Sequence, residues 1–498
     1  MPERGLPAGA GAASTDLPHP ASAAIFATAT PADDAGAWSR PAIVLAGAVL
    51  LLWPTLLNEH PYLFWDTYGY FLQGKAYWRL VLGALHVAPA PPETVGGWVG
   101  AGARMLATDP AIRSVSWSLL TYALAVTGSF WLLACANALV AAAMVELALL
   151  RLFQLRVVQR LTILAVLALV TPLSWFASYL MPDLYAGLLV LAAASLAFAW
   201  AVLRTVERIG VLVLYGASIT FHGSHLLLAL GLAGVALALP AAAGERWARA
   251  CRLAAPILAA IVAMLAASWF LFGQATLTPQ APPFLLARSW EDGPVRAYLA
   301  RTCPDAGWSI CAHVDRLAPT AQEFLWQPEN SYWSMSLEER AAVRAEEMAV
   351  VGRAVAADPL AQLVASLANA ARQLVRFGLD DFVLGRGAAV TPEDYTFVYL
   401  PTVPAAVWGL AGFSAAIRLV ATAALVALAL QLGRGRIRTG CPAWASTVLV
   451  LAALLLNAAI CGVLSGPNDR YQARIVWLLP LVAAAVTARP RGPAAPAP

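Results

Sequence analysis

The chain has 498 residues, of which 60% are hydrophobic and only 12% are charged, and its formal net charge at pH 7 is +4. This composition excludes a soluble globular protein and indicates a polytopic membrane protein. The positive charge comes mostly from short arginine clusters, without a basic stripe carrying interleaved aromatic residues. We therefore set nucleic acid aside as a partner and assign the charge to membrane orientation.

The N-terminal stretch precedes the first apolar run. Residues 1–38 are rich in Ala, Pro, Gly, Ser and Thr and lack helical periodicity. This composition is typical of a disordered tail. The stretch has no apolar core of the signal-peptide kind, so we do not expect it to be a cleavable signal.

Apolar runs of membrane-spanning length follow the tail. A span needs about 20 apolar residues, with roughly 17 to 25 tolerated. By this measure the candidate spans lie at 41–57, 128–150, 161–178, 185–203, 210–221, 224–240, 255–272, 404–430, 443–463 and 473–488. The run at 210–221 is short, and 116–126 could form a separate half-embedded helix. The sequence thus predicts an all-α polytopic membrane protein with about ten transmembrane helices, give or take two.

Arginine clusters set the expected orientation, because short positively charged loops stay in the cytoplasm. The clusters occupy alternate connections, near 151–160, 204–208, 246–252 and 434–438. Both chain termini are then expected on the cytoplasmic side of the membrane. The outer side is expected to carry the first outer loop, a long segment, and short turns at 179–184, 222–223 and 464–472. The expected regions are a cytoplasmic tail at 1–38, a transmembrane region at 39–272 with its first outer loop at 58–127, an external segment at 273–403, a second transmembrane region at 404–488, and a tail at 489–498.

The external segment is long enough for a small domain or a lid, which we expect to be of mixed structure. It contains Cys303 and Cys311, and an oxidising compartment favours a structural disulfide between them. A metal site is the weaker alternative, since His313 is close but no fourth ligand is evident. Helix-forming residues run up to Asp358–Pro359, which predicts a helix end, and 360–377 has the pattern of a second, amphipathic helix.

The first outer loop opens with the aromatic stretch NEHPYLFWDTYGYFLQGKAYW. If 62–78 is helical, one face combines a carboxylate with hydroxyl and amide groups: Asp66, Tyr70, Gln73 and Tyr77. Lys75, the only lysine in the chain, lies in the same stretch. The alternative is an interfacial amphipathic helix in which Asp66 simply faces water.

Further polar residues lie at the expected outer ends of apolar helices. They are Asp183, His222, His225, Asp469, Arg470, Tyr471 and Arg474. Ionisable residues at membrane depth are costly and tend to face a cavity or a site. Structural alternatives exist: a helix-dipole partner for Asp183, a tight interhelical turn for the two histidines, and headgroup anchors for the two arginines. Because outside-facing arginines run against the positive-inside bias, an anionic ligand such as a phosphate competes with the anchoring role.

Common signatures of soluble enzymes are absent. The sequence has no G-x-x-x-x-G-K-[ST], no G-x-S-x-G and no H-E-x-x-H motif. Their absence argues against an ATP-driven pump and against a conventional serine hydrolase.

The layout and three short motifs, FWDTYGYFLQGKA, MPDLY and NDRYQARIVWLLPL, resemble the GT-C class of integral-membrane glycosyltransferases. Members of this class use polyprenyl-phosphate-linked sugars, and the resemblance covers most of the membrane part. It implies an inverting transferase with its site on the outer face and Asp66 as general base. Residues that would hold the lipid phosphate or line the site are Tyr70, Lys75, Asp183, His222, His225, Arg470, Tyr471 and Arg474.

One departure from this class concerns the acids. Many GT-C enzymes carry two neighbouring acids in the first outer loop, whereas Asp66 has no adjacent acid. We therefore assign no cofactor and leave a divalent metal open. The departure also leaves open a chain that has the fold without the activity.

Two other functions compete with sugar transfer. A transporter or flippase of a lipid-linked or anionic substrate would be expected to show inverted repeats and broken helices, and no repeat is visible. A non-catalytic assembly partner with the same fold is the third hypothesis. The Ala- and Arg-rich composition suits a GC-rich bacterial genome, which would place the chain in the inner membrane with periplasmic outer loops.

Overall fold

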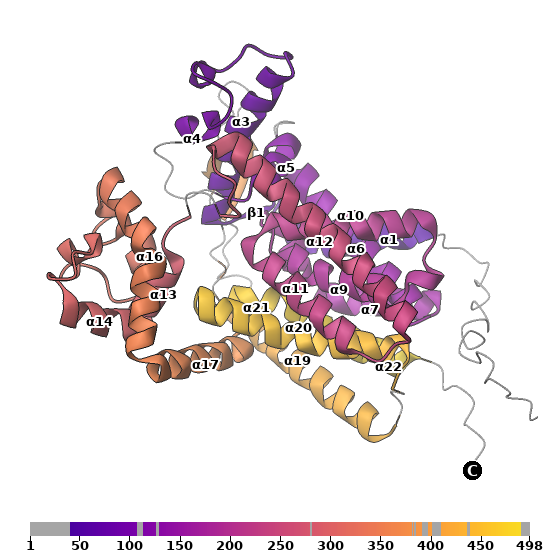
Figure 1. The fold of residues 1–498 in the computed structure, drawn as a ribbon. Helices are drawn as coiled ribbons and strands as arrows, with labels where there is room; N and C mark the ends of the chain where they lie inside the picture. Colours follow the sequence, from indigo (N-terminus) through magenta and orange to yellow (C-terminus); the bar gives the residue numbers. More distant parts are fainter. Residues whose placement is uncertain are drawn as a thin grey trace, which may run out of the picture. The chain divides into compact units, whose positions relative to one another are not determined.

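A computed structural model describes residues 40–106, 113–125, 129–278, 281–380, 382, 385–390, 397–400, 410–435 and 439–489. The expected tail at 1–38 lies outside these residues, as does the C-terminal tail beyond Arg489. The described chain is predominantly helical, as the sequence predicts (Figure 1).

The N-terminal half consists of helices and one short strand. Its α-helices are α1 (Arg40–Leu51), α2 (Trp53–Leu57), α3 (Trp65–Ala84), α4 (Ala101–Met105), α5 (Val115–Ala125), α6 (Trp131–Arg151), α7 (Val157–Val170), α8 (Leu173–Ser178), α9 (Leu184–Phe198), α10 (Thr205–Phe221), α11 (Gly223–Ala238) and α12 (Ala243–Phe272). Strand β1 (Tyr62–Leu63) precedes α3. Single-turn 3-10 helices lie at Pro92–Thr94 and Trp200–Val202.

The C-terminal half contains the external segment and the last apolar helices. Its α-helices are α13 (Phe284–Asp292), α14 (Pro294–Thr302), α15 (Ala321–Trp326), α16 (Leu337–Ala357), α17 (Pro359–Val375), α19 (Leu410–Gly433), α20 (Pro442–Leu464), α21 (Asp469–Val476) and α22 (Leu478–Ala488). Strands β2 (Gly385–Val390) and β3 (Phe397–Leu400) form an antiparallel pair, and β2 also pairs with β1. Short 3-10 helices lie at Ser309–Ala312 and Tyr332–Ser334.

Among the described residues, five helical stretches are long and apolar enough to cross a membrane. They are Trp131–Arg151, Ala243–Phe272, Leu410–Gly433, Pro442–Leu464 and Asp469–Ala488. The bent pair α16 and α17 raises this number to six if it is counted as one span, and five further apolar helices are shorter. The chain therefore has the helices of a membrane-embedded protein, although length and composition do not show about ten spans.

Two spans differ from their expected limits for local reasons. The run expected at 41–57 is divided between α1 and α2, and Pro54, which cannot donate a backbone hydrogen bond, lies in the first turn of α2. The short run expected at 210–221 extends back to Thr205 as α10. Its first turn is closed by Glu207, whose carboxylate accepts the backbone N–H of Arg204 at 2.8 Å.

Glu207 also joins three of the expected cytoplasmic elements. Its carboxylate pairs with Arg40, with Arg151 at 3.0 Å and with Arg204 at 3.1 Å. Burial alone would raise the pKa of Glu207, but hydrogen bonds from Arg151, Arg204 and Arg40 lower that pKa to about 2. The starts of α1 and α10 and the end of α6 therefore meet at one end of the bundle, as alternate arginine-bearing loops should.

The external segment has a hydrophobic core of its own. Helices α13 to α16 bury Trp290, Leu299, Phe324 and Val343 together. Cys303 and Cys311 form a disulfide in this segment, as the sequence predicts, so their sulfur atoms are not available as thiolate ligands for a metal. The predicted helix end is confirmed: α16 stops at Ala357, and the chain bends by 105° into α17.

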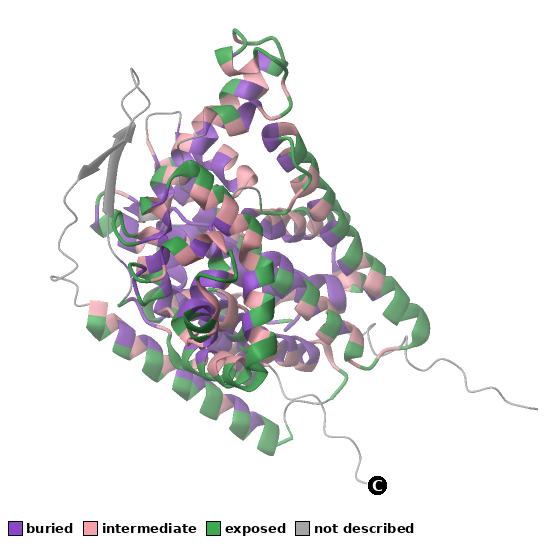
Figure 2. Ribbon diagram, turned by 60° about the vertical axis from the view of Figure 1, so that its left-hand side comes forward, coloured by how far each residue is buried: buried purple, intermediate pink, exposed green. Residues whose placement is uncertain are grey.

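Helix α3 carries the aromatic stretch of the first outer loop. It begins at Trp65, three residues later than expected, after Phe64 donates its N–H to the hydroxyl of Thr67 at 3.0 Å. Three members of the predicted face, Tyr70, Gln73 and Tyr77, are buried, whereas the fourth, Asp66, is 24% exposed. Figure 2 shows such buried positions concentrated in the interior of the helical bundle.

The buried side of α3 packs closely against α5. A Cβ atom at Gly74 would lie 2.1 Å from the carbonyl oxygen of Ser118, a distance that no side chain could occupy. Glycine at this position therefore allows the two backbones to approach. This packing fixes the first outer loop against the bundle.

Candidate functional site

Backbone pairing brings two of the sequence-predicted regions together. Strand β1 forms a bridge between Tyr62 and Tyr179, and Leu180 donates its N–H to the carbonyl of Tyr62 at 3.0 Å. The hydroxyl of Thr67 donates to the carbonyl of Leu180 at 3.2 Å. The start of α3, which carries Asp66, is therefore fixed beside the turn at 179–184.

Asp183 lies in this turn and is almost completely buried, at 1% exposed. It is the N-cap residue of α9, where the helix-dipole alternative expects an acid, but its carboxylate makes no capping hydrogen bond. Instead its Oδ1 lies 3.5 Å from Nη1 of Arg474 and 4.0 Å from Nε of Arg470. Burial by itself would raise the pKa of Asp183, but the two guanidinium groups hold it below its ordinary value. Asp183 is thus an ionised carboxylate between two buried cations.

Arg474 is the structural member of this cluster. It is 1% exposed, and its guanidinium also donates to Asn457 Oδ1 at 2.8 Å and to Ser224 Oγ at 3.0 Å. Asn457 in turn donates to the carbonyl of Tyr471 at 2.7 Å. Arg474 therefore joins α9, α11, α20 and α21, and its donors are already engaged by protein groups.

Arg470 differs from Arg474 in one respect that bears on ligand binding. Its guanidinium lies over the ring of Phe64 at 4.3 Å and over that of Tyr471 at 5.2 Å. Among the described residues, its buried Nη1 has no hydrogen-bond partner, and neither has Oδ2 of Asp183. Unpaired buried polar atoms are rare in folded proteins and call for an explanation. Arg470 therefore has a buried donor that no described residue accepts, as does Arg113 at its Nε.

Asp66 lies at the more accessible side of the cluster. Its side chain is 24% exposed, and its Oδ1 accepts from Nη2 of Arg113 at 2.7 Å. Arg113 also lies over the ring of Trp326 at 5.5 Å, so the external segment reaches this ion pair through α15. The sequence analysis missed Arg113, although the reasoning that singled out Arg470 and Arg474, arginine in an outer loop, applies to it equally.

Asp66 and Asp183 both act electrostatically on the same hydroxyl group, that of Tyr70. Tyr70 is buried one turn after Asp66, and this burial raises the pKa of its hydroxyl above the ordinary value. Asp66 and Asp183 both raise it further, whereas Arg113 and Arg470 lower it. The four charged groups therefore surround one tyrosine. The sequence predicted this convergence for all of them except Arg113.

The two histidines occupy the turn between α10 and α11. His222 Nδ1 accepts the N–H of Ser224 at 3.2 Å, and His225 Nδ1 lies 2.7 Å from the carbonyl oxygen of Ser218. Burial and the neighbouring Arg474 lower the pKa of His222 to about 4, so this imidazole is neutral. The tight-turn interpretation is confirmed. Within the described ranges, no group of His, Cys, Asp and Glu side chains is arranged to hold a metal ion, so we derive no metal chemistry.

Lys75 is the predicted residue that lies farthest along α3 from Asp66. Nine residues separate them, which corresponds to about 13 Å along the helix axis. Tyr471, in contrast, stacks against both Arg470 and Arg474 and belongs to the cluster. The structure thus groups Asp66, Tyr70, Asp183, His222, His225, Arg470, Tyr471 and Arg474, and leaves Lys75 at a distance.

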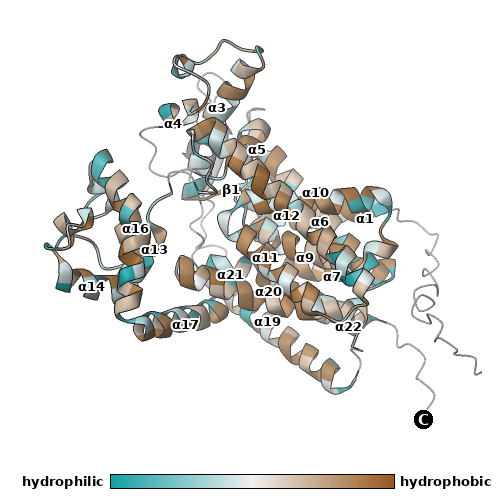
Figure 3. Ribbon diagram, in the orientation of Figure 1, coloured by the Kyte–Doolittle hydropathy of each residue, from teal (hydrophilic) through white to brown (hydrophobic). Residues whose placement is uncertain are grey.

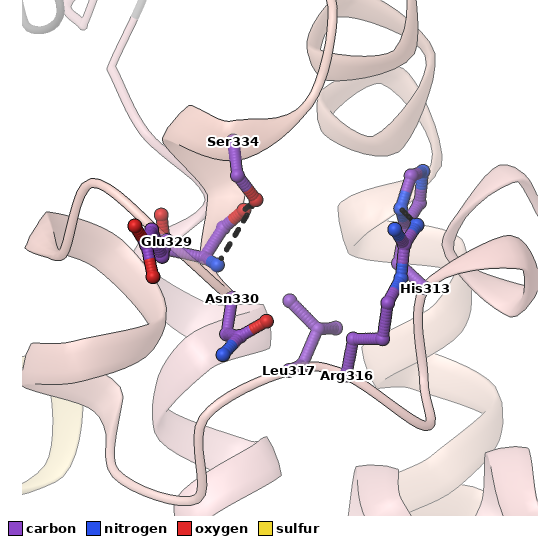
Figure 4. A pocket seen from close by; sticks show the side chains of 7 residues that line it. His313, Arg316, Leu317, Glu329, Asn330 and Ser334 are labelled. Atoms are coloured by element: carbon purple, nitrogen blue, oxygen red, sulfur yellow. Dashed lines mark hydrogen bonds between the residues drawn. The ribbon is translucent and has the colours of Figure 1, made fainter.

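A separate pocket lies within the external segment. It has a volume of about 310 Å³ and is lined by polar side chains that include His313 and Arg316 on one side and Glu329 and Ser334 on another (Figure 4). Nη2 of Arg316 donates to Nδ1 of His313 at 2.9 Å. This pocket contains none of the charged residues that surround Tyr70, and we assign it no role in the candidate site.

Gln373 supports the cluster from α17. Its Nε2 donates to the carbonyl of Asn468 at 2.8 Å, and its Oε1 accepts the N–H of Asn468 at 2.9 Å. Asn468 caps α21 by accepting the N–H of Arg470 at 3.0 Å. Gln373 therefore positions the residue that begins the helix carrying both arginines.

We expect Gln373→Met to destabilise the protein by about 1–3 kcal/mol, because two partly buried backbone groups of Asn468 lose their partners. The midpoint of thermal unfolding in detergent measures this change. Gln322→Met on α15 is the matched control, since Gln322 is exposed. Equal midpoints for the two variants would contradict the positioning role.

The chain was compared with protein-family models, with curated proteins and with solved structures, and none of them matches it.

Proposed function

We propose that the chain is a membrane glycosyltransferase that moves a sugar from a polyprenyl-phosphate donor to a hydroxyl of a glycan, lipid or protein acceptor. The observation that supports this function best is that one cluster contains both a partly exposed carboxylate, Asp66, and a cation, Arg470, whose buried Nη1 has no partner among the described residues. Sugar transfer from a lipid phosphate needs these two elements: a base for the acceptor and a cation for the departing phosphate.

The proposed reaction is one inverting displacement. Asp66 takes the proton of the acceptor hydroxyl, and the acceptor oxygen attacks the anomeric carbon. The bond from that carbon to the phosphate oxygen breaks, and its electron pair leaves with the phosphate. Arg470 donates to the phosphate as its charge increases, while Asp183 keeps Arg470 in place and ionised.

The proposed location follows from the helices. The cluster lies where α21 begins, at the end of the bundle opposite the ion pairs of Glu207. We propose that the five shorter apolar helices complete a bundle of about ten spans and that the cluster faces the periplasm across a bacterial inner membrane. A lipid-linked donor and a water-borne acceptor would meet at such a boundary.

The function is tested by Asp66→Asn in a host strain that lacks the chromosomal copy. We expect transfer to fall by about 10²–10⁴-fold, because this is the usual contribution of a general base. The accumulation of unused lipid-linked sugar and of unextended acceptor measures the change, at matched membrane levels. Asp380→Asn is the control, since Asp380 forms an exposed ion pair with Arg418 at 2.7 Å.

Two results would replace the proposal. If Asp66→Asn and wild type give the same glycan profile, Asp66 is not the base, and a non-catalytic assembly role gains support. If the purified protein forms no glycosidic bond but moves a labelled lipid-linked substrate across vesicles, the chain is a transporter or flippase.

A further inference from the structure

Helix α17 has its polar and apolar sides reversed relative to a helix that covers a protein core. Its buried residues are Asn369 and Gln373, both polar. Its exposed residues include four large apolar side chains at helical spacing: Leu360 at 68%, Leu363 at 55%, Val364 at 58% and Leu367 at 62% exposed. A surface helix of a water-soluble domain normally turns such a stripe inward. Figure 3 shows hydrophobic and hydrophilic residues mixed along α17.

Polar contacts and close backbone packing hold the buried side of α17 in place, and Leu374 is partly buried against the main core. Asn369 Nδ2 donates to Oδ1 of Asp292 at 2.8 Å, and Gln373 pairs with the backbone of Asn468. A Cβ atom at Gly462 would lie 2.7 Å from the carbonyl oxygen of Asn369, so α17 and α20 touch through their backbones. The polar side of α17 is therefore committed to the protein, and the apolar side is left facing outward.

The place where α17 contacts α20 indicates how deep α17 lies relative to the membrane. Gly462 lies two residues before the end of α20, which is one of the five candidate spans. The opposite end of α20 begins after Cys441, which Arg489 approaches at 3.8 Å near the C-terminal end of α22. Helix α17 thus crosses α20 at the end that lies next to the cluster, at the level where a spanning helix leaves the bilayer.

We propose that α17 is an interfacial helix whose apolar side lies in the outer leaflet of the membrane. Large aliphatic side chains are unfavourable in water, so four of them exposed on one side of α17 would be costly there, whereas lipid accommodates them. Arg372 and Arg376 follow in and after the last turn of α17, where the lipid headgroups would lie. The external segment is then partly membrane-bound, and the helix that fixes α21 rests on the lipid. This inference holds whether or not the chain transfers a sugar.

Fluorescence quenching tests the lipid contact. Leu363→Cys and Leu367→Cys, each combined with Cys251→Ser to remove the exposed native thiol, are labelled with bimane and placed in phosphatidylcholine and phosphatidylglycerol vesicles. An interfacial helix buries its apolar side about 5–10 Å deep, so acyl chains brominated near the headgroup should quench both labels. Aqueous iodide should have little effect on these labels.

Met348→Cys on α16 is the matched control, because Met348 is 65% exposed on the preceding helix. We expect iodide, and not bromolipid, to quench a label there. Quenching of the α17 labels by iodide alone would show that this face meets water and would overturn the proposal. Quenching by neither agent would show that protein covers the face, as in a dimer. Bromolipid quenching at both helices would instead indicate a re-entrant loop formed by α16 and α17, and would also overturn it.

Discussion

Arg474→Met is expected to destabilise the protein by about 3–5 kcal/mol, because the buried carboxylate of Asp183 loses the nearer of its two cations. Arg474 and Asp183 are each 1% exposed, and Asn457 and Ser224 would lose their donor at the same time. The midpoint of thermal unfolding in detergent and the yield of folded protein measure the loss. It should exceed the effect of any substitution at an exposed ion pair.

Two further variants separate this explanation from a general sensitivity to substitution. Arg418→Met removes the cation of the exposed pair with Asp380 and should change stability by about 0–1 kcal/mol. Asp183→Leu leaves Arg470 and Arg474 as two buried cations without their shared carboxylate, so it should destabilise the protein at least as much as Arg474→Met. If Asp183→Leu is as stable as wild type, the buried ion pairs are not the cause.

Gly187→Ala should produce the second large effect. A Cβ atom at Gly187 in α9 would lie 2.5 Å from the indole ring of Trp477, which is completely buried. Overpacking of this kind costs about 1–3 kcal/mol. Trp477 donates its Nε1–H to the carbonyl of Arg474 at 2.9 Å, so we also expect the strain to reach the cluster and to reduce any activity that depends on Arg470.

Gly234→Ala in α11 is the matched control for this substitution. It too places a methyl group on a helical glycine, but no heavy atom lies within 4 Å of the added carbon. Because alanine favours a helix by about 1 kcal/mol over glycine, this variant should be as stable as wild type or slightly more so. The thermal midpoints of the two variants, measured side by side, check the prediction. Similar midpoints would show that α9 can move away from Trp477.

Residues with strong local signals were predicted well from the sequence. The shared face of Tyr70, Gln73 and Tyr77 follows from helical periodicity, and the break between α16 and α17 follows from Asp358–Pro359. The disulfide of Cys303 and Cys311 follows from their spacing and expected compartment. The limits of spans were predicted less well, since hydropathy does not register the break near Pro54 or the added turn that Glu207 closes at the start of α10.

The candidate site was likewise predicted only in part. Its members at helix ends could be found because charge is costly next to a membrane, and this cost singles out Asp183, Arg470 and Arg474 in any apolar chain. The sequence could not show that these residues have different roles. Arg474 and Arg470 lie one helical turn apart in α21, yet one is saturated by protein groups and the other has a donor to spare, a difference that depends on Asn457 and Ser224 from two other helices.

The sequence by itself determined that this is a helical membrane protein and that its polar groups gather at the ends of apolar helices. The physical reason is that a charge buried in lipid is energetically costly. Only the tertiary structure decided that Arg113 pairs with Asp66 and that α17 turns its polar side inward. Both depend on which distant surface a side chain meets: Trp326 of the external segment lies over Arg113, and Asn468 pairs with Gln373. Helical periodicity in the sequence shows that a helix has an apolar side and a polar side, but the elements that pack against the helix decide which of the two sides faces the protein.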